Sequence, residues 1–342
     1  MKKIAIIGGY GQVGSVIVQQ LIHHGKQNLL IMGRNQKKMT YFAQSLPIAI
    51  ETRQIDLNQS IDDTQLADIQ MVIVCLDQKK TRFIQQCQRL GIDYLDITAN
   101  SIFLKKVDQL PSPFSRTLTG IGLAPGITNL AVADYLATYE NTKSVDIDIL
   151  LGIGDQHGQA AIDWTFSQLT SSYSLPHYQK PVSNFTIGKN ATFGPRYGKK
   201  TTYNFDFADQ HLLALNDSTR HYTTYLGFDV SWITKSLALL KKTKLATILK
   251  NKQVLDFLAL TMRKGIIGSN EFVVKISSPQ EMPSKMIVVY GKEEAKITGE
   301  IATLMVLKLL DSSVPAGNYL INELTTLNEV VTKLPRLTYE AY

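Results

Sequence analysis

The chain has 342 residues, 44% of them apolar and 19% charged, which is typical of a globular protein large enough for two domains. It has two cysteines, no apolar run that approaches the ~20 residues of a membrane span, and no Cys/His cluster with metal-ligand spacing. These properties exclude a disulfide-rich secreted protein. They predict a cytoplasmic protein that uses neither a membrane nor a metal.

The formal net charge of +7 is concentrated in one segment. Lys235–Lys264 contains eight basic residues against one acid, Asp256, so the rest of the chain is neutral. Apolar residues at near-helical spacing in this segment predict a surface helix with a solvated basic face. An anionic substrate or partner is the second interpretation. Nucleic acid is the third and is not expected, because the segment lacks interleaved aromatic residues and any known binding module.

The first 35 residues carry the main motif. An apolar strand ending at Ile7 runs into a glycine-rich turn, a helix begins, and a second strand follows at 29–32. This is the context of a dinucleotide fingerprint, because backbone N–H groups at a helix N-terminus hold a pyrophosphate. Two glycine registers fit, one starting at Gly8 and the other at Gly9. The predicted cofactor-binding residues of this turn are Gly8, Gly9, Gly11, Gln12, Val13 and Gly14.

Arg34 follows the second strand, where NAD-binding versions of this motif usually carry Asp or Glu for the ribose 2′-OH. The sequence Gly33-Arg34-Asn35 contains no acid, and a guanidinium can pair with a 2′-phosphate and stack on adenine. The sequence therefore predicts NADP(H) rather than NAD(H). The alternative is an exposed arginine in an ordinary strand-to-helix loop.

Strands continue to alternate with helices up to residue 122. We expect strands at 48–55, 71–76, 92–97 and 116–121, and a helix over 80–90. This pattern predicts a doubly wound parallel sheet, in which ligands bind beyond the carboxyl ends of the strands. The residues at those ends that we assign to cofactor binding are Asp56, Leu76 and Thr98. Amides around Gly126 would suit an anion or a nicotinamide amide, or simply begin the next helix.

From residue 145 the pattern changes to alternating strands. Segments at 145–151, 203–207, 272–276 and 286–290 predict an antiparallel or mixed sheet with one helix-covered face. We therefore expect an α/β chain in which a Rossmann domain over 1–122 is followed by an α+β domain over 123–295. Tail helices within 296–342 are expected to complete the first domain. An exposed face of the second sheet would suit a homodimer interface.

Several segments carry a family resemblance. They are Gly8–Gly14, Gly33–Asn35, Gly91–Thr98 and Gly122–Gly126, with a weaker match at Lys296–Ala302. In these segments the chain resembles the saccharopine dehydrogenase-like NADP-binding family. The resemblance implies a Rossmann domain, a substrate domain with a mixed sheet, and NADP(H)-linked hydride transfer at a carbon–nitrogen bond of an amino-acid-derived substrate. The loop Leu76–Lys80 departs from the family, in which a Gly-Pro type loop often lies near the nicotinamide.

Hydride transfer to an imine needs orientation, a proton shuttle and charge complementarity. His157 lies between glycines in a loop and is the first candidate for the shuttle, because its pKa range suits that task. Asp96, at a strand end, is the second candidate catalytic residue, and Asp209 is the third. The candidate substrate contacts are Gly126, Trp164, Arg196 and His211. Each also has a structural interpretation, such as a helix cap for Asp209 or a core position for Trp164.

Two other functions stay open. The first is a carbonyl or semialdehyde reductase of another Rossmann class. Against it, the Tyr139–Lys143 pair falls at a helix end, and the second domain has no cysteine to act as a nucleophile. The second is a non-enzymatic NADP(H)-binding sensor, which the altered loop at Asp77 keeps open.

Overall fold

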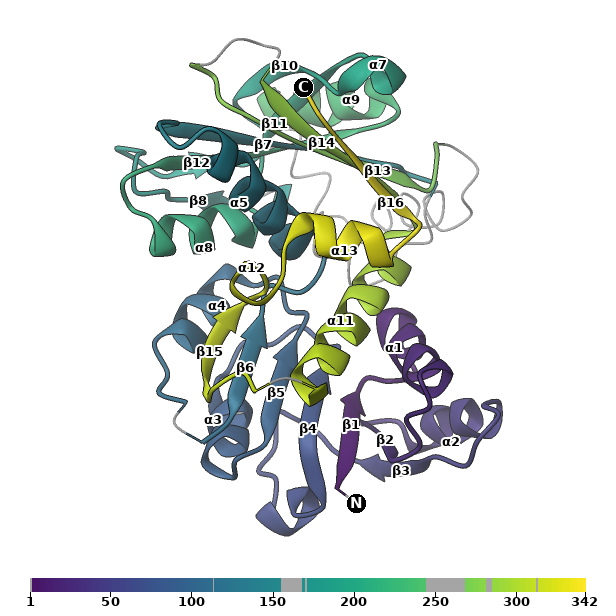
Figure 1. The fold of residues 1–342 in the computed structure, drawn as a ribbon. Coiled ribbons are helices and arrows are strands. Elements are labelled where there is room, and N and C mark those ends of the chain that lie inside the picture. The colour runs from purple at the N-terminus through teal and green to yellow at the C-terminus, as the bar shows by residue number, and fades with distance from the viewer. Residues whose placement is uncertain are drawn as a thin grey trace. The chain divides into compact units, whose positions relative to one another are not determined.

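The chain forms two compact units in the computed structural model (Figure 1), which describes residues 2–112, 114–154, 168–169, 171–243, 268–280, 285–311 and 313–342. Unit 1 comprises Met1–Gly126 and Ala295–Thr325. Unit 2 comprises Ile127–Glu294 and Thr326–Tyr342. Each unit therefore combines a long segment with a shorter segment that comes later in the chain.

Unit 1 is built on a seven-stranded sheet, sheet A, whose strand pairs are all parallel. The strand order is β15-β6-β5-β4-β1-β2-β3. The strands are β1 (Lys3–Ile7), β2 (Leu29–Gly33), β3 (Glu51–Gln54), β4 (Ile69–Val74), β5 (Asp93–Asp96), β6 (Arg116–Thr119) and β15 (Gly317–Leu320). The order from β3 to β6 is that of the doubly wound Rossmann fold, so the predicted parallel sheet is confirmed.

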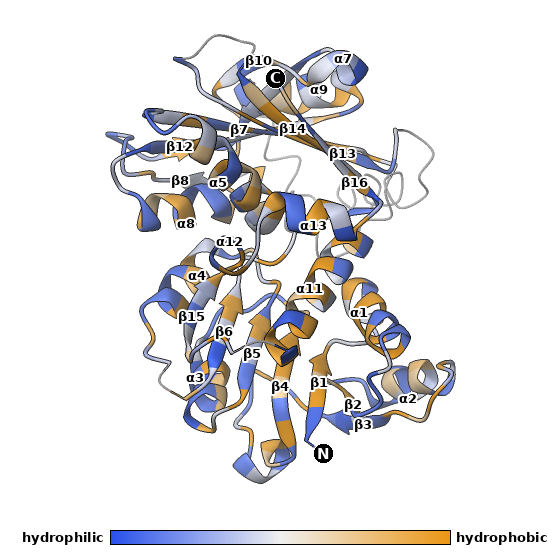
Figure 2. Cartoon of the chain, viewed as in Figure 1, coloured by the Kyte–Doolittle hydropathy of each residue, from blue (hydrophilic) through white to orange (hydrophobic). Residues whose placement is uncertain are grey.

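The central strands of sheet A form the core of unit 1. Ile6 and Ile7 of β1 and Ile73 of β4 are fully buried, as expected for a parallel sheet that is covered on both faces. Figure 2 shows apolar residues concentrated in β1 and β4 and along the helices α1 and α11. The helices of unit 1 are α1 (Gln12–His23), α2 (Gln36–Gln44), α3 (Arg82–Arg89), α4 (Ser101–Asp108), α11 (Glu294–Asp311) and α12 (Ile321–Leu324).

Unit 2 is built on a second seven-stranded sheet, sheet B, with the order β10-β11-β12-β7-β13-β14-β16. Only the β12–β7 pair is parallel, so the predicted mixed sheet is confirmed. The strands are β7 (Ser144–Leu151), β10 (Gly188–Thr192), β11 (Lys199–Asn204), β12 (His221–Phe228), β13 (Glu271–Ser277), β14 (Met286–Lys292) and β16 (Leu337–Ala341). The other described elements are α5 (Thr128–Thr138), α7 (Gly194–Tyr197), α8 (Ala208–Asn216), α9 (Ser231–Lys242), α13 (Leu327–Lys333) and a small β8–β9 sheet (Ser172–Tyr173 and Val182–Ser183).

Both faces of the central strands of sheet B are buried among the described residues. Helices α5 and α8 cover one face, on which Ile147 and Thr224 lie side by side. On the opposite face Leu150, Val273 and Val288 are at most 1% exposed and belong to one apolar cluster with Phe193, just before α7. Among the described residues the central strands of sheet B are therefore covered on both faces, and the homodimer stays a prediction.

The tail divides between the two units. We expected all of 296–342 with the first domain, but β16 pairs antiparallel with β14, as Leu337 with Gly291 and Ala341 with Ile287. The alternation in this last strand is short and partly polar, which is why it gave no strand signal. Within the described residues, no helix combines the length and apolar character that a membrane crossing needs. The basic segment begins within α9, and 244–267 lies outside the described residues.

Candidate cofactor site

The glycine turn joins β1 to α1 with its own backbone hydrogen bonds. Gly8 adopts a φ of +79°, its N–H donates to the Met32 carbonyl at 2.8 Å, and its carbonyl accepts from Gly11 N–H at 2.8 Å. Helix α1 then begins at Gln12, with Gly11 as a cap residue that offers no side-chain hydrogen bond. The first turn of α1 carries no acidic residue. This helix end therefore presents the positive end of its dipole with no carboxylate to oppose an incoming phosphate.

Two of the glycines are required by geometry. A Cβ on Gly14 would lie 2.3 Å from the Gly8 carbonyl oxygen and 2.7 Å from Gly9 Cα, so a side chain there would separate α1 from the turn. Gly8 is needed for its positive φ. At Gly9 and Gly11 the nearest atoms to an added Cβ lie at 3.1 Å, which is tight but less severe. The register that starts at Gly8 thus contains the two glycines that fix the shape of the turn.

The carboxyl ends of β1, β4 and β5 meet beside this turn. The Leu76 side chain lies against Gly8, since a Cβ on Gly8 would come within 3.0 Å of Leu76 Cδ2. Thr98 Oγ1 donates to the Leu76 carbonyl at 3.1 Å and accepts from the Gln78 N–H at 3.1 Å. The fold therefore brings three of the predicted cofactor residues together. It also holds the unusual loop after β4 in place, where burial raises the pKa of Asp77.

Asp96 ends β5 and is fully buried. Its Oδ2 accepts a hydrogen bond from the Tyr94 hydroxyl at 2.6 Å, and its Oδ1 accepts from the Thr98 N–H at 2.7 Å. Burial raises the pKa of Asp96 to about 7, although both hydrogen bonds act to lower it. With both oxygens engaged and no exposed surface, Asp96 is placed to hold the Thr98 loop rather than to exchange a proton with a substrate.

Arg34 directly follows β2 and is exposed. Its carbonyl accepts from Gln54 Nε2 at 2.9 Å, which ties the ends of β2 and β3 together, while the guanidinium makes no ion pair with any described residue. Asp56, after β3, instead accepts from the backbone and side chain of Asn58 at 3.0 and 3.1 Å. Arg34 is thus available for an anion, and Asp56 is engaged within its own turn.

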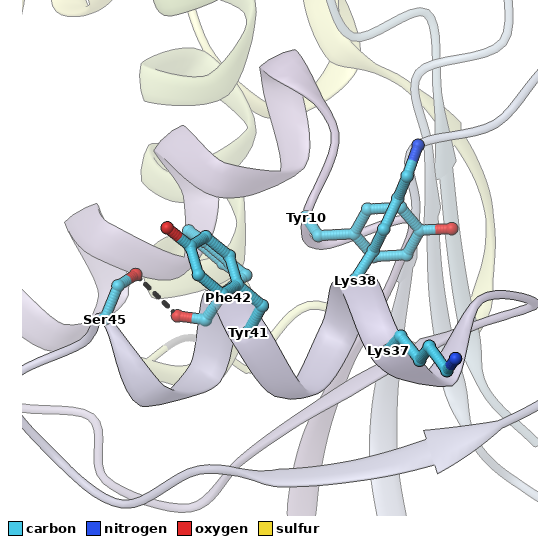
Figure 3. Close-up of a pocket in the computed structure, with 6 residues that line it drawn as sticks. All are labelled: Tyr10, Lys37, Lys38, Tyr41, Phe42 and Ser45. Atoms are coloured by element: carbon cyan, nitrogen blue, oxygen red, sulfur yellow. Dashed lines mark hydrogen bonds between the residues drawn. The ribbon is translucent and has the colours of Figure 1, made fainter.

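A surface hollow of about 400 Å³ lies between the glycine turn and the exposed side of α2. Figure 3 shows the residues that line it, namely Tyr10, Lys37, Lys38, Tyr41, Phe42 and Ser45. The Tyr10 ring packs against Gly33, where a Cβ would lie 2.9 Å from Tyr10 Cε1. The exposed Lys37 and Lys38 are not among the predicted cofactor residues, although the run from Arg34 to Lys38 places three cations within five residues.

In unit 2, Asp209 is buried within a hydrogen-bond network. Its Oδ1 accepts from Thr224 Oγ1 at 2.9 Å and from the Gln210 N–H at 2.7 Å, and burial raises its pKa. His211, one turn of α8 away from the start of the helix, is 5% exposed and its Nε2 lies 2.6 Å from Asp206 Oδ1. Asp206 had given no signal in the sequence. These contacts join α8 to its neighbours and leave little surface for a substrate.

Arg196 lies in unit 2 as Asp209 does, but on the opposite face of sheet B. Arg196 Nη2 lies 2.5 Å from Glu271 Oε1, next to the apolar cluster on the face of sheet B opposite α8. Gly126 belongs to unit 1 and is buried, with an added Cβ 3.2 Å from the Gly120 carbonyl oxygen. His157 and Trp164 lie outside the described residues. Across the described parts of both units, no group of three His, Cys, Asp or Glu side chains is arranged to hold a metal.

Comparison with known proteins finds a family match in the first part of the chain. Residues 4–140 match the family model described as the saccharopine dehydrogenase NADP binding domain. No curated protein sequence matches the chain significantly. The apo saccharopine dehydrogenase (L-Glu forming) of Saccharomyces cerevisiae aligns over 100% of both chains with 14% identity and a TM-score of 0.59, so it shares the fold.

Two further solved structures align with lower TM-scores. The WlbA dehydrogenase of Thermus thermophilus aligns over 96% of this chain and 91% of its own, with 11% identity and a TM-score of 0.45. Biliverdin reductase of Synechocystis aligns over 98% and 96%, with 10% identity and a TM-score of 0.41. The part of the chain that matches the saccharopine dehydrogenase NADP binding domain, residues 4–140, spans the glycine turn and strands β1 to β6.

Proposed function

We propose that the chain is an NADP(H)-dependent oxidoreductase of the saccharopine dehydrogenase type, which transfers hydride at a carbon–nitrogen bond of an amino-acid-derived substrate. The observation that supports it most is the N-terminus of α1 behind Gly8 and Gly14, which has no side-chain cap. At the end of the neighbouring strand, the Arg34 guanidinium makes no ion pair with a described residue. The first feature suits a pyrophosphate, and the second suits a 2′-phosphate.

Preference for NADP(H) over NAD(H) follows from charge at the end of β2. Arg34, Lys37 and Lys38 supply three exposed cations, and no acid is present to bind a ribose 2′-OH. Fluorescence titration with NADPH and NADH measures the preference. We expect Arg34→Asp to lower the NADPH/NADH affinity ratio by about tenfold or more, because hydrogen bonds to charged groups contribute about 1.5–3 kcal/mol. Lys2→Ala is the control, because the exposed Lys2 precedes β1 at the end opposite the glycine turn. An unchanged ratio in Arg34→Asp would overturn the preference.

The bound cofactor would supply the hydride, and the residues of unit 1 would hold and orient it. Gly8 to Gly14 would hold the pyrophosphate, Arg34 the 2′-phosphate, and Leu76 and Thr98 the wall at the ends of β4 and β5. Asp96 acts here as a positioning residue, because it fixes Thr98. We keep His157 as the proposed proton shuttle, to be tested by the kinetics of His157→Gln.

The C–N reaction is supported by the family match and by the name of the yeast structure that shares the fold. Its test is spectrophotometric. NADPH oxidation that requires both an amino acid and an oxo acid supports this reaction, whereas oxidation with an aldehyde or ketone alone would indicate a carbonyl reductase.

A non-enzymatic NADP(H)-binding sensor is the second candidate. The observation that favours it is the burial and pairing of Asp96, Asp209 and His211, which leaves no exposed proton donor among these three candidates. Tight NADPH binding without turnover on a broad substrate panel would support the sensor and contradict the oxidoreductase.

A further inference from the structure

Helix α11 is where the chain returns from unit 2 to unit 1. The second segment of unit 1 starts at Ala295, and α11 spans Glu294–Asp311. The residues Ile297 to Thr303 are all buried and belong to unit 1. Figure 1 shows α11 running alongside α1, the helix that begins at the glycine turn.

The contact between the two helices depends on Gly299. A Cβ at this position would lie 2.8 Å from both Cβ and Cγ1 of Val16 and 3.2 Å from the carbonyl oxygen of Val13. Real Cβ atoms do not approach other atoms this closely, so any side chain here would move one helix away from the other. A glycine inside a helix costs roughly 0.5–1 kcal/mol relative to alanine. Its presence here is explained by the close approach of α11 to α1.

A second contact places the same turn of α11 at the carboxyl edge of sheet A. A Cβ on Gly122, just after β6, would lie 3.6 Å from Thr298 Oγ1. Thr298 and Gly299 therefore touch the loop after β6 and the first turns of α1, respectively. Val13 itself lies in the first turn of α1, whose backbone faces the proposed pyrophosphate.

We infer that Gly299 is a positioning residue for the cofactor: it sets the distance between α11 and α1, and so the place of the first-turn backbone of α1 that receives the pyrophosphate. The inference rests on the proposed function and adds to it a residue that is distant in sequence from the glycine motif. Helix N-termini bind phosphate through short, directed N–H contacts. A displacement of α1 weakens those contacts and leaves Arg34, at the end of β2, unaffected.

The test compares two ligands on the full chain. Adenosine 2′-monophosphate carries the adenine and the 2′-phosphate without a pyrophosphate, so it reports on the Arg34 end alone, whereas NADPH reports on both ends. We expect Gly299→Ala to lower the affinity for NADPH by about tenfold, while the affinity for adenosine 2′-monophosphate stays within about twofold of the wild-type value. A merely structural role for Gly299 would change the affinities for both ligands together, or neither.

A double variant keeps the test falsifiable. Val16→Ala removes Cγ1, one of the atoms that the added methyl group meets, so Gly299→Ala with Val16→Ala is expected to regain part of the NADPH affinity. Unchanged NADPH affinity in Gly299→Ala, equal weakening of both ligands, or no recovery in the double variant would each overturn the inference. A wild-type chain that binds adenosine 2′-monophosphate but not NADPH would overturn the proposed function itself.

Discussion

Tyr94 and Asp96 lie on the same side of β5, and the Tyr94 hydroxyl donates a 2.6 Å hydrogen bond to Asp96 Oδ2. Both side chains are fully buried, near the carboxyl end of β5, where a dinucleotide is proposed to bind. The Asp96 carboxyl therefore links the Tyr94 side chain to the Thr98 backbone, because its other oxygen accepts a hydrogen bond from the Thr98 N–H. Both residues lie in Gly91–Thr98, one of the segments in which the sequence resembles the saccharopine dehydrogenase-like family.

The Asp96 carboxyl should make stability depend on pH. Burial raises its pKa from 3.8 to about 7, so its ionisation is disfavoured in the folded chain. The contribution of Asp96 to the free energy of unfolding is fully present below about pH 4 and is lost as pH rises through 7. The reason is that the carboxyl ionises at lower pH in the unfolded chain than in the folded one. Asp96→Asn cannot ionise. We therefore expect its stability relative to wild type to increase between pH 4.5 and 8, by an amount of order 1–4 kcal/mol, as measured by urea denaturation at both pH values.

Tyr94→Phe provides the complementary measurement. It removes a hydrogen bond that lowers the pKa of Asp96, so the loss of stability with rising pH should become larger and extend to higher pH. A difference between Asp96→Asn and wild type that does not vary with pH would contradict the raised pKa.

Gly14 should tolerate alanine far less well than Gly11. The added methyl group would lie 2.3 Å from the Gly8 carbonyl in the first case and 3.1 Å from it in the second. We expect Gly14→Ala to destabilise unit 1 by about 1–3 kcal/mol, as overpacking does, and to abolish measurable NADPH binding. Gly11→Ala should retain its thermal unfolding midpoint within a few degrees. Similar midpoints and NADPH affinities for the two variants would show that the close packing at Gly14 is not required.

The sequence predicts the features that depend on contacts between residues close together in the chain, and it misses those that depend on contacts between distant residues. The glycine turn, β1 and β2 could be predicted because Gly8, Gly14 and the apolar strand residues all lie within the first 35 residues. The β16–β14 pairing and the contact of Gly299 with Val16 join positions far apart in the chain, and no local pattern reveals them. The site follows the same division. Arg34 could be found from its place after β2, but burial of Asp96 and Asp209 is set by tertiary packing.

A buried charge cluster in unit 2 should make Lys189 important for stability. Its Nζ lies 2.6 Å from Asp146 Oδ2 and 3.1 Å from Asp148 Oδ2, and Asp148 is fully buried. Lys189→Met leaves these two carboxylates with Lys275, whose Nζ is 3.6 Å from Asp148 Oδ2. We expect a loss of about 3–5 kcal/mol in the free energy of unfolding at pH 8, since removing one partner strands a buried charge.

The loss from Lys189→Met should shrink towards pH 5. Burial already raises the pKa of Asp146 while Lys189 lowers it, so without Lys189 the carboxyl takes up a proton at higher pH. Lys333→Met is the matched control, because Lys333 forms an exposed pair with Glu329 on α13. Its effect should stay below about 0.5 kcal/mol. Equal losses for the two variants would contradict the buried-cluster interpretation.

Asp209 provides the sharpest separation of a structural role from a catalytic one. It is fully buried and accepts hydrogen bonds from Thr224 and Gln210, which Asn can also accept through its carbonyl oxygen. We expect Asp209→Asn to keep near-native stability and any NADPH oxidation activity, and Asp209→Ala to lose about 1–3 kcal/mol by leaving two buried donors unpaired. A general acid would behave in the opposite way, because Asp209→Asn would lower kcat by about 10²–10⁴-fold with the fold intact. Thermal unfolding and kcat measured on both variants separate the two roles. Since burial raises the pKa of Asp209, the stability of Asp209→Asn relative to wild type should also increase from acidic to neutral pH.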